Sequence, residues 1–216
     1  AHHGRGVLAV DFPAHGRSEG PALDSIAAMA DWTARLIAAA GLKQAALVGH
    51  SMGALVALDC AARHGDRVRA LGLCGVASEM PVHPEMLESA KANTAKVQEL
   101  MTFWGMGSAL HKGGMVSPGL WLRRESLAVL AGNKPDVIHT DLAACNAYKD
   151  APARAAAVKC PTVFVLGDGD LMTPAPKAKA LVAAIAGSTA VTIPNCGHFM
   201  MVERPDETLE ALKSRV

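Results

Sequence analysis

The chain has 216 residues, half of them hydrophobic, and a formal net charge of +1. A chain of this length and hydrophobicity can bury one sizeable core, so we expect one globular domain rather than a disordered chain. The balanced charge, with lysine and arginine scattered along the chain, offers no basic surface for a phosphate backbone. Nucleic acid is therefore not an expected partner.

Five cysteines occur at wide spacing and include no C-x-x-C pair, so we expect no zinc site and reduced, buried thiols in a cytoplasmic protein. The first residues show no basic segment followed by an apolar one, so we expect no signal peptide. An apolar window over 45–62 is interrupted by "GHSMG", whose glycines favour a turn over a membrane span. A membrane is therefore not an expected partner.

Short apolar runs bounded by turn residues predict strands at 6–10, 45–49, 68–75, 161–167 and 189–194. Apolar residues at helical spacing predict helices at 26–40, 52–64, 175–187 and 204–216. Asp24 or Ser25 can cap the first helix, and Gly41 ends it. This alternation predicts an α/β fold with a mostly parallel sheet covered by helices on both faces.

Between the third and fourth predicted strands the alternation stops. Three helix-like segments replace it, at 84–104, 120–131 and 136–149. We interpret residues 78–150 as a helical cap or lid inserted into a core made of residues 1–77 and 151–216.

The stretch "VGHSMGA" places Ser51 between Gly49 and Gly53, after a predicted strand and before a predicted helix. In such a strand-to-helix turn the glycines let the two backbones pack closely, and the strained serine presents its hydroxyl to solvent. This setting predicts that Ser51 is a nucleophile. His50, beside it, should point away from the hydroxyl and serve as support.

A serine nucleophile needs a base to take its proton, and the base needs a third group to orient it. The loop after strand 161–167 carries Asp168 and Asp170, and the loop after strand 189–194 carries His198. Loops at strand carboxyl ends are where open α/β sheets place their sites. His198 is the expected base, and either aspartate can orient it. Glu79, after an earlier strand, is a more distant choice.

The stretches "DFPAHGRS", "GHSMG", "LGDGDLMTP" and "GHFMMVERP" resemble the successive signatures of the α/β-hydrolase superfamily, in its order of serine, acid and histidine. The resemblance implies a catalytic triad of Ser51, Asp170 and His198. Its pattern G-x-x-D-x-x-x-P, counted from Gly167, selects Asp170 and leaves Asp168 as a turn residue. It also implies that the backbone N–H of Met52 helps to bind the oxyanion, and that no metal or organic cofactor is needed.

In this superfamily a further strand lies between the strands represented here by 6–10 and 45–49, and a loop with a His-Gly pair gives the second oxyanion donor. Neither is found before Gly6. We therefore expect an N-terminally truncated form of the fold, taken from a longer parent protein.

The lid segment and the loops around the predicted acid and base are rich in methionine and tryptophan. Such residues are most often core, but an apolar lining suits a small carboxylic ester. The predicted function is a serine hydrolase acting by acyl transfer on a small-molecule substrate. The alternatives are a ligand-binding or catalytically impaired relative, or another chemistry of the same triad: lactonase, carbon–carbon bond hydrolase, prolyl-type peptidase or cofactor-free haloperoxidase. The sequence does not determine the oligomeric state. The methionines and tryptophans of the lid segment and of the loops around the predicted acid and base are Met80, Met86, Met101, Trp104, Met106, Met115, Trp121, Met172, Met200 and Met201.

Overall fold

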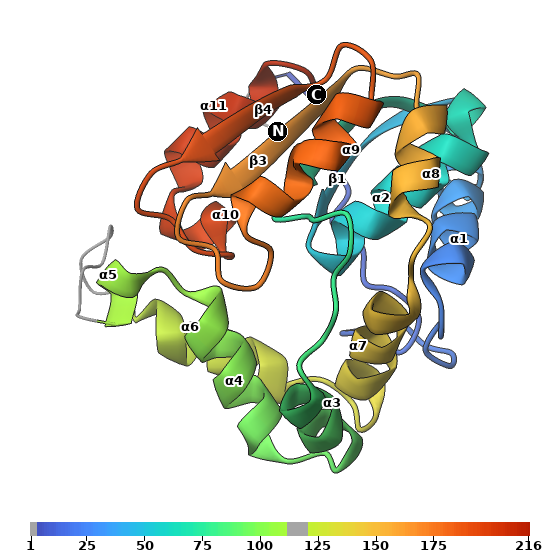
Figure 1. Ribbon diagram of the computed structural model, residues 1–216. Helices are drawn as coiled ribbons and strands as arrows, with labels where there is room; N and C mark the ends of the chain where they lie inside the picture. Colours follow the sequence, from blue (N-terminus) through green and yellow to red (C-terminus); the bar gives the residue numbers. More distant parts are fainter. Residues whose placement is uncertain (1–3, 112–120) are drawn as a thin grey trace.

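The computed structural model describes residues 4–111 and 121–216 (Figure 1). In this part of the chain four strands form one sheet in the order β1-β2-β3-β4, and every neighbouring pair is parallel. Parallel neighbours require crossover connections, and helices supply them here. The predicted α/β fold is confirmed. The strands are β1 (Ala45–His50), β2 (Val68–Cys74), β3 (Thr162–Gly167) and β4 (Thr189–Ile193).

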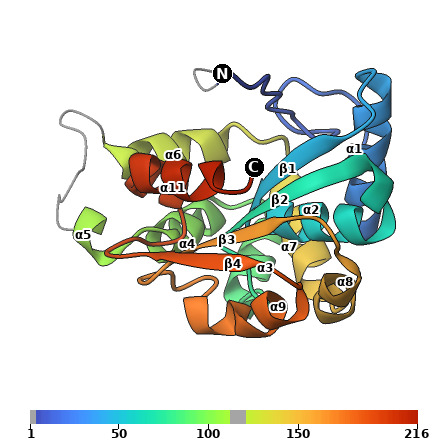
Figure 2. The same ribbon diagram turned by 90° about the horizontal axis from the view of Figure 1, so that it is seen from above.

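Helices cover both faces of this sheet, as Figure 2 shows for α11 on one side of the strands and α9 on the other. The longest, α1, has 14 residues, and none of the described helices is both long and apolar enough to cross a bilayer. The helices packed around the sheet are α1 (Ile26–Ala39), α2 (Met52–Arg63), α8 (Ala151–Ala157), α9 (Lys179–Ala184), α10 (Met200–Glu203) and α11 (Pro205–Lys213).

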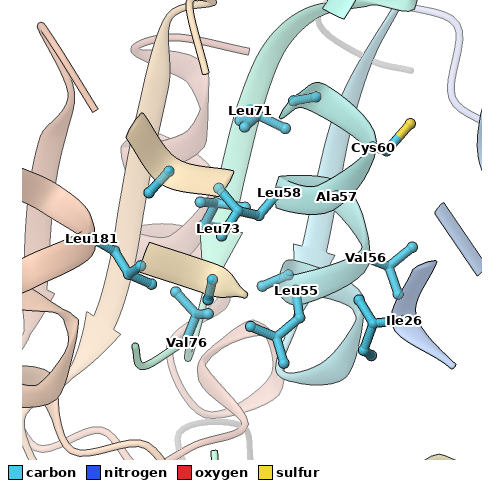
Figure 3. Close-up of a cluster of buried hydrophobic side chains, with 14 of the residues drawn as sticks. Ile26, Leu55, Val56, Ala57, Leu58, Cys60, Leu71, Leu73, Val76 and Leu181 are labelled. Atoms are coloured by element: carbon cyan, nitrogen blue, oxygen red, sulfur yellow. The ribbon is translucent and has the colours of Figure 1, made fainter. Parts of the chain in front are cut away.

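Strand β3 is buried on both faces, and its side chains alternate between two hydrophobic clusters. Phe164 and Leu166 belong to the larger cluster, which includes residues of α1, α2 and α9. Figure 3 shows part of this cluster between α2 and the strands. Val163 and Val165 belong to the cluster that contains residues of α10 and α11. Burial on both faces explains why this strand reads as a continuous apolar run.

The ends of α1 agree with the sequence prediction. The hydroxyl of Ser25 accepts a hydrogen bond from the Ala28 N–H at 3.3 Å, which caps the first turn. Gly41 adopts a φ of 72°, a left-handed conformation that glycine tolerates and that ends the helix. Local side-chain chemistry therefore fixes where this helix begins and ends.

The predicted strand at 6–10 is wrong. These residues form no strand, and Val7 and Leu8 are about 70% and 69% exposed. A strand is stabilised by hydrogen bonds to a neighbour, and no strand of the described residues pairs with this segment: β1, at the edge of the sheet, pairs with β2 alone. The edge position also leaves Val48 of β1 exposed.

Every regular element described between β2 and β3 is a helix. The predicted segment 84–104 is two helices rather than one, because Asn93 takes a left-handed φ of 51° between them. Figure 1 shows α3, α4 and α6 grouped together, away from α8, α9 and α11. Met115, which we expected in the lid, lies outside the described residues. Besides α8, these helices are α3 (Pro84–Lys91), α4 (Ala95–Gly105), α5 (Ser108–His111), α6 (Leu122–Ala131) and α7 (Val137–Ala147).

The two glycines of the turn between β1 and α2 are not equivalent. A Cβ atom at Gly49 would lie 2.1 Å from the carbonyl oxygen of Gly53, so the backbones approach closely there. A Cβ atom at Gly53 would meet no atom within 4 Å. The close packing of strand and helix therefore depends on the missing side chain of Gly49.

We predict that Gly49→Ala lowers the free energy of unfolding by about 1–3 kcal/mol, because the methyl group overlaps backbone that cannot move aside. Gly53→Ala is the matched control. It should leave stability unchanged or raise it by up to about 1 kcal/mol, because alanine favours the helix. Urea unfolding of both variants tests this, and an equal loss in both would contradict it.

Candidate active site

Ser51 lies at the junction of β1 and α2 and has a strained backbone. Its φ of 54° and ψ of −118° are unusual for a residue with a side chain and cost about 1–3 kcal/mol. The Ser51 N–H donates to the carbonyl of Cys74 at 2.9 Å, which ties the turn to the end of β2. The Ser51 side chain contributes to the wall of a cavity. Strain of this kind is typical of a residue held in place for a function.

His198 and Asp170 come from the loops after β4 and β3 and form a buried pair. The Nδ1–H of His198 donates to Oδ2 of Asp170 at 2.7 Å. The two residues are only 1% and 3% exposed. Because the Asp170 carboxylate accepts a hydrogen bond from Nδ1–H, the neutral ring carries its proton on Nδ1, and Nε2 is free to act as a base.

Thr173 completes the surroundings of the Asp170 carboxylate. Its hydroxyl donates to Oδ2 at 2.7 Å, and the N–H groups of Met172 and Thr173 both donate to Oδ1 at 2.8 Å. Burial by itself would raise the pKa of Asp170. The hydrogen bond from His198, the charge interaction with His198 and the hydrogen bonds from Thr173 together outweigh burial and lower the pKa of Asp170 below its ordinary value. The acid is therefore held ionised.

The other acidic candidates do not contact His198. Oδ1 of Asp168 accepts from the Cys196 N–H at 3.2 Å, so this side chain braces the loop that precedes the histidine. Glu79 is exposed and lies in the cavity wall. Of the three carboxylates considered from the sequence, Asp170 is the one that the structure joins to His198.

Gly75 makes room for the imidazole of His198. A Cβ atom at Gly75 would lie 3.0 Å from both Cε1 and Nδ1 of His198, and the φ of Gly75 is 55°. This glycine directly follows Cys74, the acceptor for the Ser51 N–H. Nε2 of His198 is buried without a hydrogen-bond partner, so no hydrogen bond joins it to the Ser51 hydroxyl.

His50, next to Ser51, contacts both the backbone and the ring of His198. Its Nε2–H donates to the carbonyl oxygen of His198 at 2.7 Å, and the two ring centres are 4.5 Å apart. Although part of the His50 side chain stays exposed, loss of hydration and the nearby His198 ring lower its pKa to about 3. His50 is therefore a neutral donor, and its hydrogen bond is directed at the backbone of His198.

Met52 is the first residue of α2, so its backbone N–H has no intrahelical acceptor. It follows Ser51 directly, at the positive end of the helix dipole. This N–H group is suited to bind negative charge that develops next to the serine.

The cavity beside Ser51 has a volume of about 390 Å³. Part of its wall comes from the core, including Leu171 and Thr173 next to Asp170, and part from the helices between β2 and β3. Met106 and Met200, which we considered for the lid lining, are instead fully buried core residues. The lining is largely apolar. Its ionisable residues are Glu79, His83, Cys145 and Lys177. The other residues that line the cavity are Ser51, Met80, Pro81, Val82, Met86, Trp104, Leu142, Leu171, Met172 and Thr173.

Comparison with known proteins identifies the family. The sequence profile described as the alpha/beta hydrolase family matches residues 1–211. The chain belongs to the alpha/beta hydrolase family. This agrees with the superfamily expected from its sequence motifs, and with the parallel sheet between helices.

The hydrolase resembles several proteins that are named for related activities. It is 30% identical to a pimeloyl-[acyl-carrier protein] methyl ester esterase of Chromobacterium violaceum, over 95% of this chain and 82% of that one. A Klebsiella pneumoniae protein, RutD, named as a carbamate hydrolase, is 29% identical over 93% of this chain and 77% of its own. The solved structure of a thermophilic esterase superimposes with a TM-score of 0.75 at 29% identity, covering 94% of this chain and 77% of that one. These relatives place the chain among the hydrolases.

The cysteines of the hydrolase are all free thiols, and four of the five are buried. Burial raises the pKa of Cys145, which lines the cavity, to about 12, so this thiol is not a nucleophile near neutral pH. Within residues 4–111 and 121–216, no group of three or more histidine, cysteine or acidic side chains could hold a metal ion.

Two residues of the site were missed in the sequence analysis. Thr173 holds the Asp170 carboxylate, and Glu203 accepts hydrogen bonds from both neighbours of His198. The signal for Thr173 was a hydroxyl residue three positions after the acid. For Glu203 it was a single acidic residue after the apolar run that follows His198.

We predict that Asp170 makes the free energy of unfolding of the hydrolase depend on pH under acidic conditions. Because its folded pKa is lowered, Asp170 stabilises the fold above its unfolded pKa of about 4, and this contribution is lost as the pH falls through the folded value. The free energy of unfolding of Asp170→Asn should therefore fall less than that of the wild type between about pH 5 and about pH 2. Urea titrations across this range measure it. Asp24→Asn, at an exposed position, should follow the wild-type curve.

Proposed function

We propose that this protein is a serine hydrolase that cleaves small, largely apolar carboxylic esters by acyl transfer. In this proposal Ser51 is the nucleophile, His198 the general base and Asp170 the group that orients the base. The observation that carries the proposal is the buried imidazole of His198, bonded to Asp170 through Nδ1 and left with an unpartnered Nε2. A buried nitrogen without a partner costs stability, and a function is one reason why a protein keeps it.

The reaction begins when the Ser51 oxygen attacks the ester carbonyl and its proton passes to Nε2 of His198. The Met52 N–H donates to the oxygen that becomes negative. When the tetrahedral intermediate collapses, the imidazolium gives its proton to the leaving alcohol. Water, deprotonated by His198 in the same way, then attacks the acyl group on Ser51, and the imidazolium returns its proton to the Ser51 oxygen as the acid is released. Asp170 stays ionised throughout and stabilises the imidazolium.

The cavity supports a small apolar substrate. A volume of about 390 Å³ lies near the lower end of the range for small-molecule sites. Its apolar side chains suit the acyl or alkoxy part of an ester better than a charged group. The names of the relatives at 29–30% identity include two esterases, which supports ester hydrolysis as the reaction.

We also propose that residues 78–150 act as a cap over this site. Met86, Trp104 and Leu142 contribute to the cavity wall from α3, α4 and α7. They also pack in a hydrophobic cluster of the insertion, which Met172 joins from the loop after β3. The cap in this proposal therefore supplies part of the substrate pocket and shields the reaction from water.

We predict that Ser51→Ala lowers the hydrolysis of p-nitrophenyl acetate at least about a thousandfold, because no other group can form the acyl-enzyme. The same variant should lose labelling by a fluorophosphonate probe, whereas Ser214→Ala, at an exposed position, should keep both activities. Stoichiometric ester binding by the wild type without serine-dependent turnover would favour a ligand-binding protein instead.

Leu171 offers a test of the pocket. It follows Asp170, lines the cavity and is 68% exposed, so a substrate seated there should cover it. We predict that Leu171→Ala raises KM for p-nitrophenyl butyrate about fivefold, which corresponds to about 1 kcal/mol of lost apolar burial, and raises KM for the acetate less. Leu209→Ala, on α11, is the control. Equal KM values for Leu171→Ala and the wild type with both esters would show that substrate binds elsewhere.

A further inference from the structure

Glu203 is a buried carboxylate that no catalytic step uses. It lies at the end of α10 and is 2% exposed. Its Oε2 accepts from the N–H groups of Gly197 at 2.9 Å and Gly107 at 3.1 Å, and its Oε1 accepts from the N–H of Phe199 at 3.2 Å. Two of these donors flank His198 in the chain, and the third, Gly107, lies in the insertion just after α4.

The backbone of His198 itself is bonded to the insertion. Its N–H donates to the carbonyl oxygen of Gly105, the last residue of α4, at 2.7 Å. Together with the Glu203 bonds, this fixes three successive N–H groups, those of residues 197, 198 and 199. The loop that carries the imidazole is therefore held by one carboxylate of the core and by the end of one helix of the insertion.

Glycines allow these two segments to touch. A Cβ atom at Gly197 would lie 2.3 Å from the backbone nitrogen of Gly107, and one at Gly105 would lie 2.4 Å from the ring of Phe199. The segment 105–107 and the segment 197–199 are thus in direct backbone contact. A shift in one must move the other, because packed protein interiors leave no slack to absorb it.

We propose that Glu203 is a positioning residue for His198, and that through it the end of α4 sets the orientation of the imidazole. This inference rests on the proposed function, in which His198 is the base. It implies that the insertion does more than enclose substrate: the segment 105–107 must be docked for the base to be correctly aimed. Any opening of the cap that preserves activity must therefore leave this end of α4 in place.

The test replaces Glu203 by glutamine in the full chain. An amide has one acceptor oxygen and an NH₂ group in place of the second, so it cannot accept all three backbone N–H bonds. We expect kcat for p-nitrophenyl acetate to fall about tenfold to a hundredfold, as a misplaced catalytic group would cause, with KM changed less than about twofold. Glu207→Gln, at an exposed position four residues later, should match the wild type.

A readout that does not depend on turnover accompanies the kinetics. The Nδ1 proton that His198 shares with Asp170 should give a low-field NMR signal, which Asp170→Asn removes and so identifies. In Glu203→Gln this signal should shift or broaden, whereas in Glu207→Gln it should not. If Glu203→Gln folds and leaves both kcat and this signal unchanged, the proposal is overturned. If the wild type shows no serine-dependent hydrolysis, the proposed function fails, and the NMR signal alone decides the role of Glu203.

A second variant approaches the same contact from α4 and covers the case in which Glu203→Gln does not fold. Gly105→Ala keeps Glu203 but places a methyl group against the Phe199 ring, next to His198. We expect a similar loss of kcat and a similar change in the NMR signal, and partial recovery of both when Phe199→Leu is added to make room. A folded Gly105→Ala protein with wild-type kcat and an unchanged signal would overturn the proposal.

Discussion

A buried carboxylate must be matched by hydrogen-bond donors, and two carboxylates of this kind surround His198, one bonded to its ring and one to the backbone on either side of it. Asp170 receives the imidazole Nδ1–H, a threonine hydroxyl and two backbone N–H groups. Glu203 receives three backbone N–H groups from around the same loop. Burying an unpaired charge costs several kcal/mol, so these donors cannot move away singly. The side chain and the backbone of the histidine are thereby held in place before any substrate arrives.

The sheet makes this arrangement possible for residues that are far apart in the sequence. Strands β3 and β4 are parallel neighbours, so the loops at their carboxyl ends lie side by side and present Asp170 to His198. Ser51 follows β1, and the end of β2 lies between it and those loops. Gly75, directly after β2, has no side chain, and the imidazole occupies the space that a side chain would fill. One small residue thus makes room for the imidazole directly after the residue whose carbonyl oxygen binds the Ser51 N–H.

The insertion and the core are joined at two places with different consequences. At the cavity, side chains of both form one apolar wall, so the shape of the substrate pocket depends on each. At the segment 105–107, the contact is between backbones and involves the loop of His198. In the function that we propose, changes in the first contact should alter which substrate binds, whereas changes in the second should alter how well His198 acts as a base.

The sequence determined the features that local chemistry controls. The cap at Ser25, the left-handed Gly41 and the apolar run of β3 follow from side-chain type and spacing, and the structure agrees with the predictions made from them. The family could also be predicted from the sequence, because its motifs lie in short continuous stretches. The strand expected at 6–10 was wrong, because a strand needs a neighbour and the sequence of one segment does not say which neighbour it has.

Only the tertiary structure showed that Asp170, which the family pattern selects, contacts His198 while Asp168 contacts Cys196, and what Thr173 and Glu203 contact. It also separated the roles of Gly49 and Gly53, which look alike in the motif. The physical reason is the same in each case. A hydrogen bond or a close approach depends on distances between segments that are remote in the chain, and those distances exist only once the strands are paired and the helices packed.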